Sequence, residues 1–188
     1  MKRLAIFGSG GGTNAENICS YFSNSSRIVV ACICTNNKDA FIVKRAKKLN
    51  IPVIYTTKKD LFSFSLLHKA LKKFSVDYIV LAGFLLKVPL KMVKCYPKKI
   101  INIHPSLLPK YGGKGMYGRN VHKAVLKNKE KKSGITIHFV NENYDSGKII
   151  LQKSCVISNF ETIESLEIKI RDLEFNNFPK TIEKIILK

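Results

Sequence analysis

A histidine and an asparagine lie two positions apart in a segment with the sequence Ile-Asn-Ile-His-Pro-Ser-Leu-Leu-Pro-Lys-Tyr, residues 101–111. Strand alternation predicts that Asn102 and His104 share one side of a strand, and Pro105 ends regular pairing directly after His104. An amide donor and a titratable imidazole held together at a strand end could stabilise an oxyanion and move a proton. A single histidine is also common in a structural role, so spacing alone leaves both interpretations open.

A glycine-rich segment, Gly-Ser-Gly-Gly-Gly-Thr-Asn, occupies residues 8–14. Glycines let backbone amides approach an anion closely, and Thr13 followed by Glu16 is a capping-box pattern that predicts a helix start. Because such a helix start has free N–H groups and a partial positive charge, the segment predicts a phosphate site. It is neither a dinucleotide fingerprint, since Thr13 replaces the third glycine, nor a P-loop, since no Gly-Lys-Ser/Thr follows. The alternative is a glycine-rich turn without a ligand.

A third polar segment, Val-Asn-Glu-Asn-Tyr-Asp-Ser-Gly at residues 140–147, begins where the predicted strand Ile135 to Val140 ends. An isolated aspartate before Ser-Gly, here Asp145, is typical of a turn. By itself this segment indicates no chemistry.

Short β-rich apolar runs alternate with helical patterns along the chain, which indicates βαβ units and a doubly wound, mostly parallel α/β sheet with helices on both faces. The predicted strands are Leu4 to Phe7, Ile28 to Cys34, Pro52 to Tyr55, Tyr78 to Ala82, Ile100 to Ile103, Ile135 to Val140 and Ile149 to Ile157. The predicted helices are Asn14 to Phe22, Asp39 to Leu49, Ser63 to Phe74, Asn120 to Leu126 and Thr162 to Leu187. In such sheets ligands bind at the carboxyl ends of the strands, and the three polar segments each follow a strand.

The size of the chain, 188 residues with 45% hydrophobic content, predicts a single domain over residues 1–188. The start Met1-Lys2-Arg3 lacks an apolar signal region, and no run is long enough to span a membrane, so we expect a cytoplasmic protein. The five cysteines form no Cys-x-x-Cys pair, which favours reduced thiols and no metal site. Cys32 and Cys34 share a strand face, where small buried side chains are expected.

The formal net charge of +20 raises the question of nucleic-acid binding. Lysines dispersed along the whole chain provide the excess, whereas arginine, the residue suited to bidentate phosphate contacts, occurs only at positions 3, 27, 45, 119 and 171. Dispersed lysines at helix ends and loops are typical of a solvated surface or of genomic base composition. We therefore expect no specific nucleic-acid site.

Taken together, the loop that ends in Gly12-Thr13-Asn14, the segment Leu81-Ala-Gly-Phe84, the Asn102-to-Pro109 segment and Asp145-Ser-Gly147 resemble the phosphoribosylglycinamide formyltransferase family of purine synthesis. The order and spacing of these motifs fit nearly the whole chain. The resemblance implies a Rossmann-like formyltransferase fold and transfer of a formyl group from 10-formyltetrahydrofolate to the amine of 5-phosphoribosylglycinamide. It also implies small-molecule substrates, no metal, no membrane partner, and a monomer or weak homodimer.

The resemblance also implies residue roles. Asn102, His104 and Asp145 match the family's catalytic trio, in which the aspartate holds the histidine protonated and the imidazolium and amide stabilise the oxyanion. The sequence does not decide whether His104, Asp145 or a bound water relays the proton that leaves the amine. The matches to the substrate site are Gly12, Thr13, Asn14 and Glu174, and the matches to the folate site are Leu85, Leu86, Lys87, Val88 and Asn102.

Two parts of the chain depart from the family pattern. The segment Gly112 to Gly118 is longer and richer in glycine than its counterparts, and it is interpreted either as a mobile lid over the folate or as a plain surface loop. The family's basic residue after the third strand has no secure counterpart, so Lys58 and Lys59 stay unassigned. Among the other histidines, His138 is expected to be structural, and His68 and His122 are expected at the surface.

Three other activities compete with this interpretation. A methionyl-tRNA formyltransferase shares the Asn-x-His-Pro-Ser-Leu-Leu-Pro string but carries a C-terminal domain and has no use for the glycine loop. A formyltetrahydrofolate deformylase usually carries an additional N-terminal domain. A basic RNA-binding module would need exposed aromatic residues interleaved with arginine, and no such cluster is present.

Overall fold

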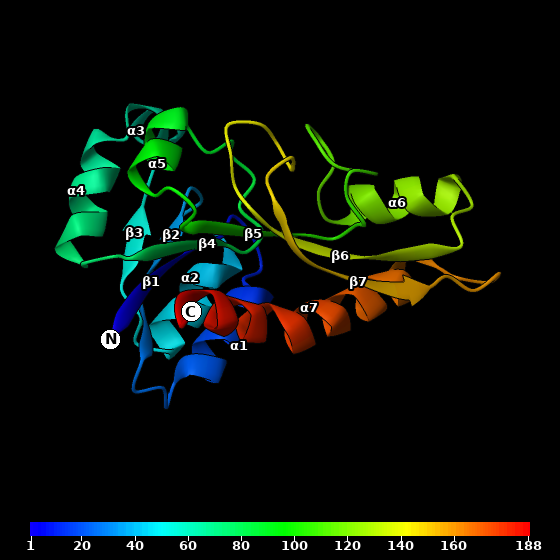
Figure 1. Ribbon diagram of the computed structural model, residues 1–188, viewed down its shortest axis with the longest axis horizontal. Helices are drawn as coiled ribbons and strands as arrows, with labels where there is room; N and C mark the ends of the chain where they lie inside the picture. Colours follow the sequence, from blue (N-terminus) through cyan, green and yellow to red (C-terminus); the bar gives the residue numbers. More distant parts are fainter.

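One seven-stranded sheet in the order β3-β2-β1-β4-β5-β6-β7 runs through the computed structural model, which describes residues 1–188 (Figure 1). Neighbours from β3 to β5 pair in parallel, whereas β6 pairs antiparallel with both β5 and β7. The predicted doubly wound, mostly parallel sheet is therefore confirmed. The strands are β1 (Lys2–Phe7), β2 (Ile28–Thr35), β3 (Val53–Tyr55), β4 (Tyr78–Leu81), β5 (Ile100–His104), β6 (Lys132–Phe139) and β7 (Ile149–Val156).

Seven helices connect these strands, two more than the sequence pattern predicts. They are α1 (Thr13–Phe22), α2 (Phe41–Lys48), α3 (Lys58–Ser63), α4 (Ser65–Lys73), α5 (Leu90–Cys95), α6 (Arg119–Lys127) and α7 (Ile163–Ile186). The predicted helix Ser63 to Phe74 is wrong at its start, because Phe64 has a left-handed backbone (φ 59°) that separates α3 from α4. Burial of the Phe64 ring, which is 3% exposed, stabilises this break. The six-residue helix α5 is too short to give a periodic signal.

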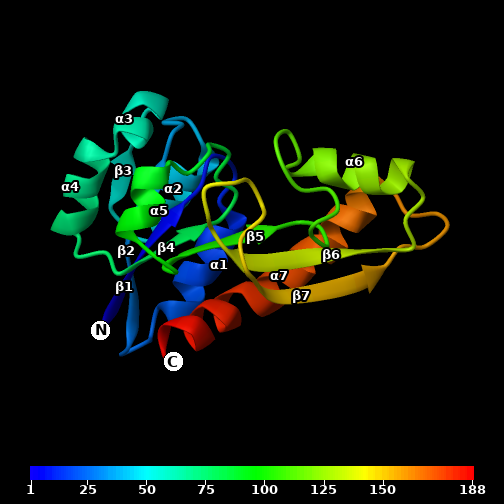
Figure 2. The same cartoon turned by 45° about the horizontal axis from the view of Figure 1, so that its top comes forward.

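Helices cover both faces of the sheet: buried side chains of α1, α2, α6 and α7 form one core with the sheet, and those of α3, α4 and α5 form the other. Figure 2 shows α3, α4 and α5 grouped at one end of the molecule, and α6 and α7 beside the β6–β7 hairpin. Successive side chains of β1 point to opposite faces of the sheet and so belong to different cores. Leu4 and Ile6 belong to a core of 26 buried residues under the first set of helices, whereas Ala5 and Phe7 belong to a core of 14 buried residues under the second set. A parallel sheet buried on both faces explains why the early strands are apolar without interruption. Cys32 and Cys34 are buried, unpaired members of the smaller core, as predicted.

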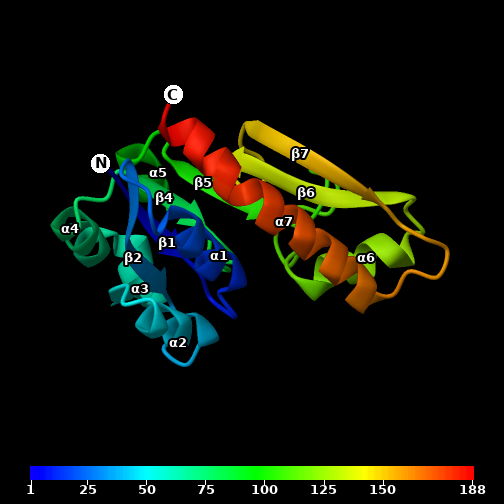
Figure 3. The ribbon, with the colours of Figure 1, turned by 90° about the horizontal axis from the view of Figure 1, so that it is seen from below.

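The β6–β7 hairpin extends the sheet beyond its parallel half, and α7 crosses the sheet from this hairpin toward β1 (Figure 3). Since β6 runs antiparallel to β5, its last residue, Phe139, lies opposite Ile101 near the start of β5. The loop after β6 therefore does not leave the sheet at the carboxyl ends of the parallel strands. Although the polar segment follows β6, Asp145 reaches the cavity only because the loop folds back along β5.

Packing of α7 gives a test of the core. Phe178 is fully buried in the larger core, so Phe178→Ala should lower the free energy of unfolding by about 3–5 kcal/mol through lost burial and a residual cavity. Phe160 is 93% exposed, and Phe160→Ala should change the free energy of unfolding by less than about 0.5 kcal/mol. Urea unfolding followed by circular dichroism measures both. Equal losses in the two variants would contradict this packing of α7.

Candidate active site

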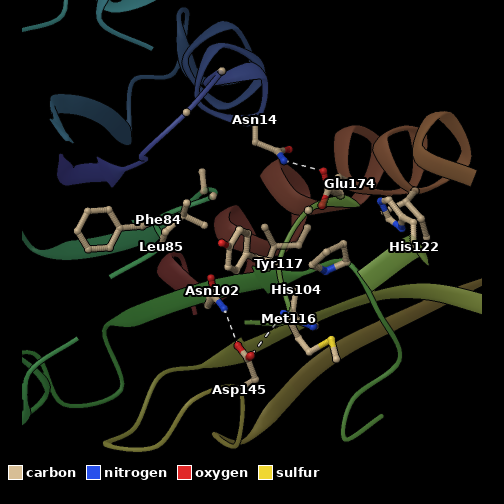
Figure 4. A pocket seen from close by; sticks show the side chains of 18 of the residues that line it. Asn14, Phe84, Leu85, Asn102, His104, Met116, Tyr117, His122, Asp145 and Glu174 are labelled. Carbon is tan, nitrogen blue, oxygen red and sulfur yellow. Dashed lines mark hydrogen bonds and ion pairs between the residues drawn. The ribbon is translucent and has the colours of Figure 1, made fainter. Parts of the chain in front are cut away.

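A cavity of about 750 Å³ opens at the carboxyl ends of β1, β4 and β5 (Figure 4). Its walls come from the glycine loop before α1, the residues after β4, the end of β5, the segment after Gly112, and one face of α7. The side chains and backbone that line it include Gly10–Asn14, Ala82–Leu85, Asn102–Pro105, Gly113–Gly118, His122, Tyr144, Asp145, Glu167, Ile170, Arg171 and Glu174. A volume of this size is sufficient for small-molecule substrates.

Helix α1 begins with Gly12 as its N-cap, in a left-handed conformation (φ 75°), and no side chain caps the helix. The predicted Thr13–Glu16 capping box is wrong, because Thr13 is already inside the first turn and the Glu16 carboxylate instead binds Arg45 of α2. Since no side chain caps the first turn, its N–H groups are left for a ligand at the cavity.

The glycine loop is held against α2. A Cβ atom at Gly12 would lie 2.6 Å from the side chain of Ile42 and 2.9 Å from its Cα, so only glycine fits here. The Ile42 N–H donates to the carbonyl oxygen of Gly10 (3.1 Å), and Arg45 Nε donates to that of Gly11 (3.0 Å). These bonds turn both carbonyls toward α2, so that they do not compete with the amides for an anion.

Asn14 and Glu174 meet across the cavity wall, where Asn14 Nδ2 donates to Glu174 Oε2 at 2.7 Å (Figure 4). Burial raises the pKa of Glu174 to about 7, although the Asn14 hydrogen bond and the charge of Arg171 lower it. The Oδ1 atom of Asn14 is buried without a partner. The pair therefore presents a carboxyl group that titrates near neutrality beside an unsatisfied acceptor, which suits a ligand that donates hydrogen bonds.

Asn102, His104 and Asp145 are brought together at the opposite side of the same cavity. Asn102 and His104 lie on one side of β5, as alternation predicts, and Asp145 reaches them from the loop after β6. Its Oδ2 lies 3.6 Å from His104 Nδ1, and its Oδ1 lies 3.5 Å from Asn102 Nδ2. The His104 ring is buried, so an ion pair with Asp145 is little screened by water.

His138 lies beside this trio, opposite Asn102 in the β5–β6 ladder. Its Nε2 is 3.1 Å from Asn102 Nδ2, and its Nδ1 is 2.8 Å from the Phe139 carbonyl oxygen. Because an amide NH₂ only donates and a carbonyl only accepts, Nδ1 must carry the proton and Nε2 must accept. Burial lowers the pKa of His138, which is consistent with a neutral ring. The structural role predicted for His138 is therefore specific: it orients the Asn102 amide.

A smaller cavity of about 60 Å³ adjoins the large one, and the two share Phe84, Asn102, Tyr144 and Asp145. Leu86, Lys87 and Val88 line the smaller cavity, while Leu85 lines the larger. The Leu85 N–H donates to Ser9 Oγ (3.0 Å), which ties this strip to the glycine loop. The strip predicted for folate binding thus lies directly beside the trio.

The sequence did not predict several of the residues that line the large cavity. The surface location predicted for His122 is wrong: it is 3% exposed, lines the large cavity, and its Nδ1 has no partner. Val121 and Val125 lie on the buried face of α6, and His122 lies on the same face. The spacing of these two apolar residues could have predicted that His122 is buried. On α7, Glu167, Ile170 and Arg171 have helical spacing with Glu174, which could have placed them on one face.

The segment Gly112 to Gly118 forms one wall of the cavity. The Gly113 N–H donates to Asp145 Oδ2 (2.9 Å), and Lys114, Met116 and Tyr117 line the space beside it. The segment therefore borders the site, and its role as a mobile lid stays a prediction. Lys58 and Lys59 lie on α3 and line neither cavity.

No cluster of three or more His, Cys, Asp or Glu side chains could hold a metal ion. None of the helices combines the length and the apolarity needed to cross a membrane.

The fold and the site together define a formyl transferase: the model of the formyl transferase family matches residues 2–182, and the chain belongs to this family. Among curated proteins, it is 41% identical to the chloroplastic phosphoribosylglycinamide formyltransferase of Arabidopsis thaliana, over 98% of this chain and 65% of that protein. It is 36% identical to the phosphoribosylglycinamide formyltransferase of Haemophilus influenzae, over 97% of this chain and 86% of that protein.

Solved structures agree with these relatives. The phosphoribosylglycinamide formyltransferase of Bacillus halodurans superimposes with a TM-score of 0.88 at 34% identity, over 100% of this chain and 96% of that chain. The chain spans less than two thirds of the length of two plant relatives, 65% for Arabidopsis thaliana and 61% for Vigna unguiculata.

The raised pKa of Glu174 predicts a pH-dependent cost in stability. The native carboxyl keeps its proton up to about pH 7, while the unfolded one loses it near 4.5, so native stability falls as pH rises between these values. Glu174→Gln removes this cost and retains an acceptor for Asn14. The variant should gain about 1–3 kcal/mol over the natural chain at pH 7.5 and almost nothing at pH 4.5, by urea unfolding. The same gain at both pH values would show that Glu174 is not the titrating group.

Proposed function

We propose that this chain transfers the formyl group of 10-formyltetrahydrofolate to the amine of 5-phosphoribosylglycinamide in de novo purine biosynthesis, giving formylglycinamide ribonucleotide and tetrahydrofolate. One observation carries the proposal: a single cavity has an uncapped helix start at one side and the Asn102, His104 and Asp145 trio at another. A phosphate and a reacting amine on one substrate could occupy these two places at once. The names of the relatives described above support the same activity.

Substrate binding follows from the charges along the cavity. The amides of Gly12, Thr13 and Asn14 and the positive end of α1 suit the phosphate, and Arg171 adds a cation to the same cavity. Glu174, which faces Asn14, suits the glycinamide end, because a carboxyl group can accept hydrogen bonds from an amine or amide. We assign these four predicted residues to the phosphoribosyl substrate.

Folate binding is assigned to the strip that follows β4. Leu86, Lys87 and Val88 line the smaller cavity together with apolar side chains such as Phe84 and Val140, and Leu85 lines the larger cavity beside them. A pterin needs paired hydrogen bonds inside an apolar slot, and backbone groups supply them whatever the side chains are. Asn102 borders both cavities and therefore lies between the two ligands.

The chemistry assigned to the trio is stabilisation of an oxyanion. When the amine attacks the formyl carbon, negative charge develops on the formyl oxygen, and protonated His104 and the Asn102 amide can both donate to it. Asn102 Nδ2 directs one hydrogen at His138, and its second hydrogen, directed toward Asp145 Oδ1 with Nδ2 3.5 Å away, is available to an oxyanion on that side. In this proposal the Asp145 carboxylate, 3.6 Å from His104 Nδ1, is the negative charge that faces the imidazolium. Collapse of the tetrahedral intermediate breaks the bond between the formyl carbon and the folate nitrogen, and the proton lost by the amine reaches that nitrogen through His104, Asp145 or a bound water.

The reaction itself is the first test. Purified protein with both substrates should produce formylglycinamide ribonucleotide, detected by mass spectrometry, and should not release formate when the amine substrate is omitted. His104→Ala provides the matched control, because the folded variant keeps both cavities but loses the imidazolium. Formate release at the rate of the complete reaction would identify a deformylase instead and would reject the proposal.

The trio should act as one unit, since each group depends on the others for its charge or position. His104→Ala and Asp145→Asn should each lower kcat by at least ~10², and the double variant should be little slower than either single variant. Steady-state kinetics give kcat, and circular dichroism confirms folding. A folded His104→Ala protein with near-normal kcat, or losses that multiply in the double variant, would remove the trio from the mechanism.

A further inference from the structure

The two ring nitrogens of His104 face two different oxygen atoms of the protein. Nε2 lies 2.7 Å from the backbone carbonyl oxygen of Tyr111, and Nδ1 lies 3.6 Å from Asp145 Oδ2. The first distance is that of a short hydrogen bond, whereas the second exceeds hydrogen-bonding distance. The ring is therefore anchored at Nε2 and free to exchange partners at Nδ1.

This geometry selects one tautomer. A carbonyl oxygen has no hydrogen to give, so the 2.7 Å contact requires a proton on His104 Nε2 in every ring state. The neutral ring then has its lone pair on Nδ1, and the charged ring has its second hydrogen there. Nδ1 faces Asp145 Oδ2, and the other oxygen of the same carboxylate lies 3.8 Å from Nε2 of His138.

Tyr111 is itself held in place from outside the cavity. Its backbone is left-handed (φ 58°), which is uncommon for a residue with a side chain. Its hydroxyl donates to Glu130 Oε1 (3.0 Å) and accepts from Asn128 Nδ2 (3.0 Å), so both capacities of the phenol are used. Two residues further along, the Gly113 N–H donates to Asp145 Oδ2. The same short segment thus contacts both members of the His104–Asp145 pair.

We propose that Tyr111 is a positioning residue: its phenol, bound to Glu130 and Asn128, holds its carbonyl against His104 Nε2 and so reserves Nδ1 for the proton that is exchanged during the reaction. The consequence for catalysis rests on the proposed formyl transfer, whereas the tautomer does not. Fixing the tautomer of a catalytic histidine through its non-reacting nitrogen is a known physical device, because a ring with the wrong tautomer has no proton or lone pair where the chemistry needs it.

The tautomer is tested without substrate. The chain has four histidines, so ¹⁵N-histidine labelling gives few signals, and His104→Ala identifies those of His104. At a pH where the ring is neutral, we expect the proton on Nε2 and the lone pair on Nδ1. A neutral ring with its proton on Nδ1 would overturn the proposal, even if the protein proves to be an active formyltransferase.

The phenol is tested by Tyr111→Phe, which removes one oxygen and keeps the ring. Loss of the anchor should lower kcat about three- to tenfold, with KM for both substrates within about twofold, and should mix the two neutral tautomers in the ¹⁵N spectrum. Lys110→Ala is the matched control, because Lys110 binds the same Glu130 carboxylate (2.8 Å) but makes no hydrogen bond with the phenol. Unchanged kcat and tautomer in Tyr111→Phe, or equal losses in both variants, would overturn the role of the phenol.

Discussion

The position of Asp145 beside His104 is the constraint on which the rest of the site depends. Asp145 leaves an antiparallel strand whose end lies opposite the start of β5, so the chain must turn back before the carboxylate can reach the ring. Gly147 makes this return possible, since a Cβ atom there would overlap the carbonyl oxygen of Phe139. The Asp-Ser-Gly motif is therefore a steric requirement of the loop as well as a carrier of the carboxylate.

A buried ion pair is costly unless its other hydrogen-bonding positions are filled, and here the surrounding backbone fills them. The Gly113 N–H donates to Asp145, and the Tyr111 carbonyl accepts from His104. The glycine-rich segment that departs from the family pattern thus begins by completing the pair and continues as a wall of the cavity. Any movement of this segment would change the partners of Asp145, which links access to the cavity with the arrangement of the charged groups.

The charge of the molecule is divided between its surface and its site. Lysines supply the +20 net charge, yet the wall formed by α7 carries two carboxylates, Glu167 and Glu174, with Arg171 between them. Desolvation already holds the Glu174 carboxyl near the middle of its titration at neutral pH. A hydrogen-bond donor placed beside this carboxyl group would favour its ionised form.

The sequence by itself determined the order of the seven strands, five of the seven helices and the motifs of the family, because apolar runs, glycines and Asn-x-His-Pro are local signals. The partners of those motifs depended on contacts between distant elements, which no local pattern encodes. The position of Glu16 in the sequence predicted that it caps α1, but its carboxylate forms an ion pair with Arg45 of α2. His122 had a polar side chain in an amphipathic helix, and only the packing of α6 beside α7 turned it into the cavity. The register between β5 and β6 placed His138 against Asn102. The loop that follows the antiparallel strand β6 turned back and placed Asp145 beside His104. Strand pairing and chain reversal both depend on the tertiary structure, so the local sequence did not predict these two contacts.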